Sequence, residues 1–488
     1  MRLRPLAALL VSLQLAAPAG AQGLPDLGDA SAASLSDSQE RTIGNRIMRE
    51  VRIDPVYVDD PEVSDYINAL GLRLLAGVEG PRREIDFFVV QDDTVNAFAL
   101  VGGHIGVHTG LLTLTQNENE LAGVMAHEIS HIVQRHQARA IHGSRGSGFT
   151  SLAALAIAIL AARSGSSQGG QVTEAAIAGA TALQIQNQLD YTREHEREAD
   201  RVGLTILERT GFDTRGMASF FERLLRANRL NEFKGAPSYL RTHPLTTERI
   251  ADIQDRIQGT PSRLVQDSFD YRLVKAKLRA NSGSPTEAVA LFRTMLEDKT
   301  ILRPREEVYG LALAQRRARD FEGAWKTLAP LRDNQPPQAS FELLAAQLLA
   351  DRGRKEEALV VYRAALRSFA RNRGLVYGYL TLLLQSGQAR DVIADLDDRL
   401  RTVQDDAQLY EIQARALAAA GKPVAQHRAQ AEAYYRRGNL GAAVDQLELA
   451  VKLKTNDFYE ASSAESRLRE LRTLLDNERA AEKALKIS

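Results

Sequence analysis

The segment GVMAHEISHIVQRH, residues 123–136, contains two histidines and a glutamate whose spacing suits metal chemistry. His127 and His131 are four residues apart, so on a helix both imidazoles project from nearly the same side. Two such imidazoles can share one tetrahedral zinc ion. Glu128 lies about 100° around the helix from His127, within reach of a water at the metal. The pattern predicts a hydrolase in which zinc activates water and Glu128 accepts its proton.

A third ligand must come from a later element that faces this helix, and the helical segment REHEREADRVG supplies the candidates. Its apolar and small residues place both His195 and Glu196 near the inward side, so periodicity does not choose between them. Asp200 favours Glu196, because a carboxylate one turn further on can accept the spare N–H of a zinc-bound histidine. Glu194 and Glu198 are predicted to point away. Without a third ligand, the pair in HEISH would be ordinary surface histidines.

The segments before the motif predict a small sheet packed against the motif's helix. EIDFFVVQD predicts one strand, and NAFALVGGHIGVHTG predicts two strands joined by a turn at Gly102 and Gly103. Thr115 and Glu118 have the spacing of a capping box. We expect them to begin one long helix that continues through HEISH and beyond it.

A different pattern begins after residue 263, where helical segments alternate with short turns. Gly353, Gly387 and Gly421 recur at intervals of 34 residues. Small residues let paired helices approach closely, and glycine relieves the turn between them. A 34-residue period is typical of tetratricopeptide repeats, and an unrelated helical array is the alternative. One repeat, near RARDFEGAWKTL, lacks the glycine.

Composition narrows the classes of partner and compartment. Lys+Arg and Asp+Glu are both 62, and this balance argues against nucleic acid as the main partner. The chain starts with arginines, an apolar run and a small-residue cleavage site, so residues 1–21 are predicted to be a signal peptide. An uncleaved membrane anchor is the alternative, although the run is short for spanning a bilayer. The absence of cysteine excludes disulfides and cysteine lipidation, so we expect a soluble protein of a bacterial periplasm.

These features divide the chain into four predicted segments. The signal peptide at 1–21 is followed by a zinc metallopeptidase domain at 22–258, a tetratricopeptide repeat domain at 259–475 and a charged tail at 476–488. Within the peptidase domain, two apolar runs between 149 and 185 predict a buried helical hairpin. A mobile flap or a lipid-contacting element near the active site is the alternative, so peripheral membrane contact stays open.

HEISH is followed 65 residues later by EREAD, with NAFALVGGHIGVHTGLL upstream and RTHPLTTERIADI downstream. This constellation resembles the metallopeptidases related to HtpX and the CAAX prenyl endopeptidases. The signal peptide and repeats resemble the periplasmic branch of that family, and the resemblance covers nearly the whole chain. It implies that His127, His131 and Glu196 bind one zinc ion per chain and that Glu128 is the base. The implied fold is mostly α with a small β-sheet, a gluzincin-type metalloprotease domain followed by a tetratricopeptide α-solenoid.

The resemblance also assigns roles outside the motif. Asp200 would support a zinc ligand, and His243, in THP, would lie on a loop that can approach the zinc and cap it. The hairpin at 97–107 would carry the edge strand along which substrate lies. His104 departs from the family pattern there and is predicted to be a solvent-exposed strand histidine. The remaining histidines have no convergent partners in the sequence and are not predicted to be ligands: His108, His136, His142 and His427.

By this resemblance the chain is a periplasmic zinc endopeptidase. The implied clients are unfolded or misassembled outer-membrane β-barrel proteins, and the implied partner is the barrel assembly machinery, contacted through the repeat domain. Pairing of backbones along an edge strand predicts loose sequence selectivity. The alternative function is a chaperone or assembly adaptor with a largely repressed protease. A catalytically dead scaffold is disfavoured because base, ligands and supporting carboxylate are all present.

Overall fold

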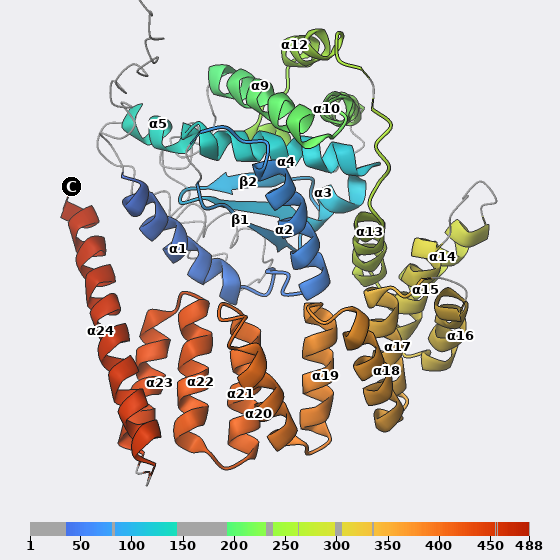
Figure 1. Ribbon diagram of the computed structural model, residues 1–488. Helices are drawn as coiled ribbons and strands as arrows, with labels where there is room; N and C mark the ends of the chain where they lie inside the picture. Colours follow the sequence, from blue (N-terminus) through green and yellow to red (C-terminus); the bar gives the residue numbers. More distant parts are fainter. Residues whose placement is uncertain are drawn as a thin grey trace, which may run out of the picture.

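The computed structural model describes residues 36–80, 83–143, 193–230, 238–261, 263–297, 305–333, 336–453, 455 and 457–487. A small sheet surrounded by helices lies above a row of antiparallel helices (Figure 1). The predicted signal peptide and the predicted apolar hairpin between 149 and 185 lie outside the described residues. Within the described part of the chain, no helix combines the length and the apolar character needed to cross a bilayer.

The described chain begins with two helices and three strands. They are α1 (Asp37–Ile53), α2 (Pro61–Leu75), β1 (Asp86–Val90), β2 (Ala97–Leu100) and β3 (His104–His108). The strand order is β1-β3-β2, with β1 parallel and β2 antiparallel to the central β3. Gly102 and Gly103 form the β2–β3 turn with φ of 86° and 89°, conformations that glycine adopts without steric cost. The predicted strands and hairpin are confirmed.

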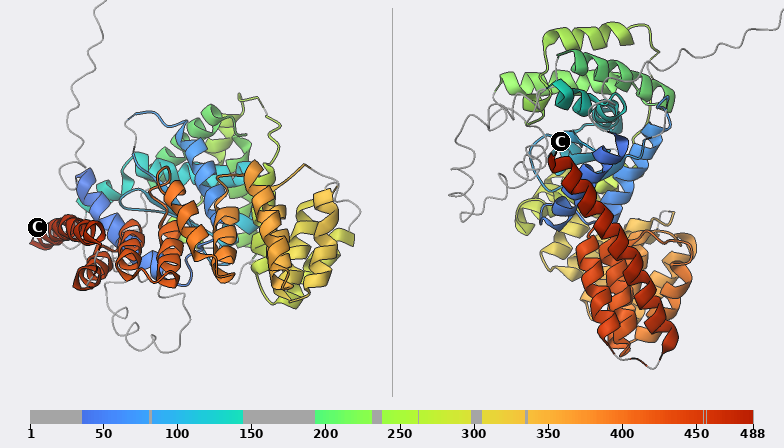
Figure 2. Two further views of the ribbon diagram at one scale, coloured as in Figure 1. Left: turned by 60° about the horizontal axis from the view of Figure 1, so that its bottom comes forward. Right: turned by 90° about the vertical axis from the view of Figure 1, so that its left-hand side faces the viewer.

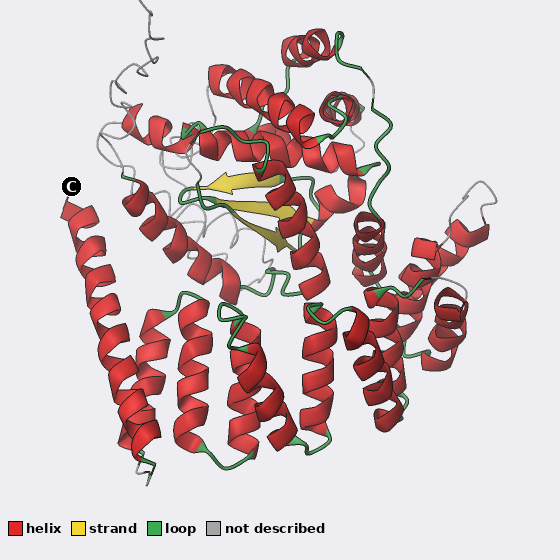
Figure 3. Cartoon of the chain, in the orientation of Figure 1, coloured by secondary structure: helices red, strands yellow, loops and turns green. Residues whose placement is uncertain are grey.

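Alternating side chains of the sheet face two different cores, and helices enclose the strands (Figure 3). Phe87 and Val89 belong to the core shared with α2 and with α4 (Glu118–Val133), the helix that contains HEISH. Phe88 and Val90 point the other way and pack against α1. The edge strand β2 lies against α4, so the sheet fixes the position of the motif.

The start of α4 differs from its prediction. Asn117 is the N-cap, and its side chain accepts a hydrogen bond from the backbone N–H of Glu120 at 3.0 Å. The predicted capping box of Thr115 and Glu118 is therefore wrong. Thr115 is buried, with its hydroxyl 2.8 Å from that of Tyr271, because the chain before α4 packs against the first repeat helix.

The end of α4 also differs from its prediction. The helix stops at Val133 instead of continuing. Arg135 takes a left-handed φ of 54°, and the chain resumes as α5 (His136–Gly143). The single long helix predicted here is therefore two helices with a sharp change of direction between them.

Two helices, α9 (Arg193–Thr210) and α10 (Arg215–Arg229), pack on α4, and α12 (Thr247–Ile257) packs on these two. The short α11 (Ser238–Thr242) precedes α12, and the short α3 (Thr109–Leu114) lies between β3 and α4. Gly203 allows α9 to approach α4 closely, because a Cβ there would lie 3.3 Å from the backbone nitrogen of His127. The predicted close helix contact at the motif is confirmed.

The rest of the described chain is helical. Its helices are α13 (Phe269–Asn281), α14 (Pro285–Glu297), α15 (Arg305–Arg317), α16 (Phe321–Asp333), α17 (Ala339–Asp351), α18 (Lys355–Ser368), α19 (Arg373–Gln385), α20 (Ala389–Arg399), α21 (Ala407–Ala419), α22 (Pro423–Arg436), α23 (Leu440–Lys452) and α24 (Phe458–Ile487). Neighbouring helices pack as antiparallel pairs in one row (Figure 2). The predicted fold class, a mainly helical unit with a small β-sheet followed by an α-solenoid, is confirmed. Residues 476–487, predicted as a charged tail, continue α24.

The 34-residue period is the distance in sequence between successive turns, and in each turn one residue has a left-handed backbone conformation. Gly353, Gly387 and Gly421 lie between paired helices with φ of 78°, 78° and 72°. In the repeat that lacks glycine, Arg319 adopts the same conformation with φ of 63°. Gly438 places a further such turn between α22 and α23.

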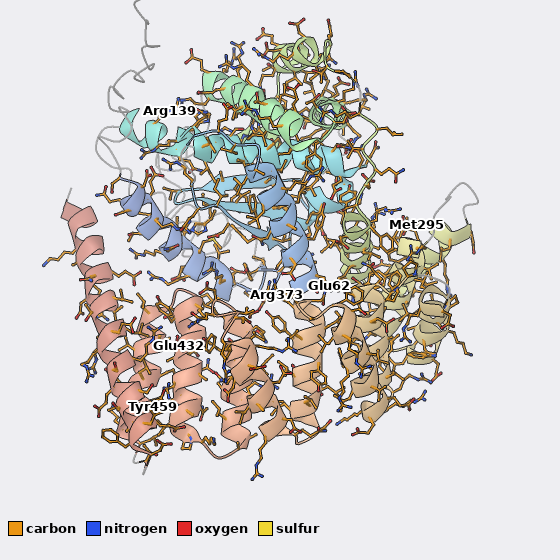
Figure 4. The ribbon with its side chains drawn as sticks, viewed as in Figure 1. Glu62, Arg139, Met295, Arg373, Glu432 and Tyr459 are labelled. Carbon is orange, nitrogen blue, oxygen red and sulfur yellow. The ribbon has the colours of Figure 1, made fainter. Side chains whose placement is uncertain are left out.

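The repeat helices contact the peptidase unit at several points along the row. Lys277 of α13 lies 2.6 Å from Asp60 and 2.5 Å from Glu62, at the start of α2. Arg373 of α19 lies 2.7 Å from Asp65 of α2, and Figure 4 labels Glu62 and Arg373 where the two parts meet. The long α24 packs beside α1 at the other end of the row. The repeats are therefore anchored to α1 and α2 on the side of the sheet away from α9.

Candidate active site

Four buried side chains from three parts of the fold converge beside the sheet. His127 and His131 come from α4, Glu196 from α9 and His243 from the loop between α11 and α12, and their ligand-type atoms all lie within 4.8 Å of one another. The Nε2 atoms of the two α4 histidines are 3.0 Å apart. Glu196 lies 3.4 Å from Nε2 of His127 through Oε2 and 3.5 Å from Nε2 of His131 through Oε1.

These distances match a tetrahedral metal site. Ligand atoms at about 2.0–2.1 Å from a metal centre lie about 3.3 Å from one another in a tetrahedron. The three spacings among His127, His131 and Glu196 fall around that value. The sequence left His195 and Glu196 as rivals for the third position, and the structure brings only Glu196 into the cluster.

Asp200 and Arg249 support the cluster from behind. Nδ1 of His127 lies 3.0 Å from Asp200 Oδ1, as the spacing on α9 predicted. Arg249 of α12 donates to both oxygens of Asp200 at 2.8 Å and lies 2.7 Å from Glu196. It also donates to the carbonyl of Pro244 at 2.9 Å, and so ties the loop after α11 to α9. Arg249 was not predicted, because in the sequence TERIADI it has the pattern of an ordinary polar residue on an amphipathic helix.

Charge in the cluster favours a bound cation. Burial opposes ionisation of Glu196, but His243 and His127 hold the pKa of this carboxyl well below its usual range. Burial also opposes ionisation of Asp200, yet His127 and Arg249 lower its pKa. Both side chains are therefore carboxylates in a nearly dry environment, where compensating positive charge is needed.

Glu128 is buried beside the four ligand-type residues, with a side-chain exposure of 0%. No side chain among the described residues donates a hydrogen bond to its oxygens; the backbone N–H of Ala99 on β2 lies beside the carboxylate, and Nε2 of His243 is 3.5 Å away. Burial raises the pKa of its carboxyl. A carboxylate buried without a side-chain donor destabilises the fold, so this placement points to chemistry and not to structure.

Residues 61–257 match Peptidase family M48. The beta-barrel assembly-enhancing protease of Escherichia coli K12 is 32% identical over 457 residues, which cover 93% of this chain and 92% of that protein. The chain belongs to this group of M48 peptidases. It is therefore a metalloprotease with a helical repeat region. The predicted family is confirmed.

More distant proteins match parts of the M48 peptidase. The mitochondrial metalloendopeptidase OMA1 of Schizosaccharomyces pombe is 30% identical over 190 residues, which cover 39% of this chain and 52% of that protein. A crystal structure of a tetratricopeptide repeat protein from Parabacteroides merdae covers 61% of this chain and 98% of its own at 14% identity, with a TM-score of 0.29.

Two residues next to the cluster of the M48 peptidase lie where the sequence did not place them. His136 was predicted to lack convergent partners, yet its Nδ1 lies 2.8 Å from Nδ1 of His131. Glu198 was predicted to point away, yet it is partly buried and its carboxylate lies 3.1 Å from Nε2 of His136. His195 stacks on His136 with ring centroids 4.4 Å apart. Burial lowers the pKa of His136 to about 4.

His104 is buried, contrary to its prediction. It was predicted to be a solvent-exposed strand histidine, but its side chain is only 1% exposed and lies 3.2 Å from the carboxylate of Asp86. It opens the central strand β3, where neighbouring strands cover both sides. Its ring packs against α1 at Gly44, where a Cβ would come within 3.0 Å. His104 therefore faces the α1 core.

The edge strand β2 presents alternate backbone groups outward. His108 donates to the carbonyl of Asn96, so even-numbered residues of this strand bond to β3 and odd-numbered ones face away. The outward carbonyl of Ala99 accepts from the side-chain amide of Gln137 at 2.5 Å. The outward carbonyl of Val95 accepts from the N–H of Tyr239 at 3.2 Å. Residues of α5 and α11 thus occupy hydrogen-bonding sites of the edge.

Because Arg249 compensates the charges of Asp200 and Glu196, we expect Arg249→Met to destabilise the folded protein strongly. Loss of a buried, 3% exposed guanidinium leaves Asp200 and Glu196 uncompensated, and we expect a loss of about 3–5 kcal/mol in unfolding free energy. The loss should be larger in chelator than in zinc, because a divalent ion supplies the missing positive charge. Thermal unfolding under both conditions measures it.

Arg256→Met is the matched control on the same helix. Arg256 is 43% exposed and pairs with Asp252 at the surface, so its removal should cost under about 1 kcal/mol. Equal effects of the two substitutions would contradict the compensating role of Arg249.

Proposed function

We propose that this M48 peptidase is a periplasmic zinc endopeptidase that cleaves misfolded or stalled envelope proteins during outer-membrane β-barrel assembly. The observation that carries the proposal is the buried carboxylate of Glu128, to which no described side chain donates a hydrogen bond, beside four converging ligand-type residues. His127, His131 and Glu196 would hold one zinc ion per chain. Two imidazoles and a carboxylate at tetrahedral spacing are a donor set that zinc takes in catalytic sites.

Residues of this chain would divide the hydrolytic work as follows. Glu128 accepts a proton from the attacking water and delivers it to the leaving amine, and its raised pKa favours this role. Asp200 accepts the Nδ1–H of His127 and so directs Nε2 into the cluster. A bound zinc ion would supply Lewis acidity, polarising the scissile carbonyl and making water more acidic.

The substrate would bind as an extended chain along β2. The backbone groups of Ala97 and Ala99 face away from β3, and an added strand can pair with them. Backbone pairing reads little side-chain identity, so selectivity would be loose. A substrate amide that bonds to the carbonyl of Ala99 must first displace the side chain of Gln137.

The name of the Escherichia coli relative supports outer-membrane β-barrel proteins as clients and the barrel assembly machinery as partner. The repeat row would contact that machinery, because solenoids present extended binding surfaces. The predicted signal peptide at 1–21 would direct the protein to the periplasm. The boundaries proposed for the peptidase and repeat domains remain 22–258 and 259–475.

A second function, an assembly adaptor with a largely repressed protease, is favoured by the position of His243. Nδ1 of this histidine lies 3.0 Å from Glu196 and 3.4 Å from Nε2 of His127, where a fourth ligand would lie. Its ring stacks on the buried Tyr239 with centroids 4.7 Å apart. In this arrangement His243 caps the site and occupies the space between the ligands and Glu128.

Glu128→Gln should abolish casein cleavage while zinc remains bound. The amide cannot accept the proton of water, and the loss of a general base lowers the rate by about 10²–10⁴-fold. Zinc content and casein turnover, measured on the same preparation, check this. Glu194→Gln, at an exposed position on α9, is the control and should keep full activity. If Glu128→Gln supports outer-membrane assembly fully, the adaptor function dominates.

His243→Ala should raise the cleavage rate severalfold, because the rate scales with the fraction of sites that are open. The same assay on His427→Ala, a histidine of α22 bonded to Gln446, controls for loss of an imidazole elsewhere. An unchanged rate would remove the capping role. A lower rate would indicate that His243 stabilises the transition state instead.

Gln137→Leu should lower KM by about fivefold with a smaller change in kcat. The substitution removes one hydrogen bond, worth about 1 kcal/mol, that competes with substrate for Ala99. Gln258→Ala, exposed after α12, is the control. A KM that does not fall would show that substrate does not use this carbonyl.

A further inference from the structure

The break after α4 brings two histidines into contact that a continuous helix would hold apart. Residues five apart on an α-helix point about 140° away from each other. Arg135 breaks the helix with φ of 54°, a conformation that side-chain-bearing residues rarely adopt. Its guanidinium lies 2.6 Å from the buried Glu40 of α1, and this contact holds the break in place. As a result, Nδ1 of His136 lies 2.8 Å from Nδ1 of His131.

His136 is in turn fixed from its other side. Its Nε2 lies 3.1 Å from the carboxylate of Glu198 on α9, and the side chain of His136 has 0% exposure. Nη1 of Arg139 lies 3.2 Å from the same carboxylate oxygen, and Figure 4 places Arg139 on α5, above the sheet. His136 and Arg139, both after the break, therefore contact the same carboxylate on α9.

The hydrogen positions along the series of contacts from His131 through His136 to Glu198 follow from its two ends. An ionised carboxylate can only accept, so Nε2 of His136 carries the hydrogen and Nδ1 of the neutral ring accepts. At the other end, Nε2 of His131 faces His127 and Glu196 inside the cluster. A histidine that binds a metal through Nε2 keeps its hydrogen on Nδ1 and donates it outward. Both ends require the same bond, from Nδ1–H of His131 to Nδ1 of His136.

We propose that His136 is a positioning residue that holds His131 in the tautomer and ring orientation needed to bind zinc. The inference rests on the zinc site of the proposed function. It gives the second histidine ligand an outer partner, as Asp200 serves the first, but with a neutral imidazole in place of a carboxylate. It also explains the strained conformation of Arg135, because only the break at this residue brings His136 into contact with His131.

The test compares His136→Gln with His136→Met, two side chains of nearly equal size. The amide oxygen of glutamine can accept from His131 and its NH₂ can donate to Glu198, whereas the methionine thioether is a weak acceptor and donates nothing. We expect His136→Met to raise the zinc dissociation constant about 10–100-fold and His136→Gln to restore most of the affinity. Competition with a fluorescent zinc chelator measures the constant, and thermal unfolding of the metal-free proteins shows whether the two variants fold equally well.

The outcomes separate this inference from the proposed function. Wild-type affinity in both variants would overturn the role of His136, and so would an equal loss in both, since that would reflect packing alone. Recovery in His136→Gln but not in His136→Met, at equal metal-free stability, supports it. Wild-type protein that takes up no zinc would instead overturn the proposed function.

Discussion

The close packing of α9 on α4 is the constraint on which the site depends. Helix α4 contributes His127 and His131 and α9 contributes Glu196, and Gly203 lets the two backbones come near enough for Glu196 to reach both histidines. The same packing buries the carboxylates of Glu128, Glu196 and Asp200. Three buried carboxylates strongly destabilise a fold unless positive charge accompanies them. Arg249 supplies part of that charge, and a divalent ion in the cluster would supply the rest.

The helix that carries the histidines is fixed at both ends by other parts of the fold. At its start, Glu118 accepts hydrogen bonds from the backbone and hydroxyl of Ser268 at 2.9 and 2.7 Å. Ser268 is the N-cap of α13, the first repeat helix. At its end, the break at Arg135 is held by Glu40 of α1. A displacement of the first repeat would therefore act directly on the start of the catalytic helix, which links the repeats to the site physically.

Local patterns predicted the elements, and contacts distant in sequence supplied what was missed. HEISH, the strands and the 34-residue period can each be recognised from the sequence pattern alone, and the structure has them where expected. The burial of His104 was missed because strand order decides it, and β3 turned out to be central. The break at Arg135 was missed because nothing in the local pattern marks an arginine as left-handed. Arg249 reaches the cluster through Asp200 and Glu196, which are about fifty positions away, so periodicity could not assign it.

Charge balance explains why the two histidines of α4 have different outer partners. With Glu128, Glu196 and Asp200 ionised, the charges of Arg249 and a divalent ion offset theirs completely. A further carboxylate in contact with His131 would leave the buried site negative and raise the cost of desolvation. A neutral imidazole accepts the same hydrogen bond without adding charge. The carboxylate of Glu198 then lies one ring further out, where it is 28% exposed and paired with Arg139. The chain through His136 thus orients the ligand while keeping the fourth acid and its counterion outside the interior.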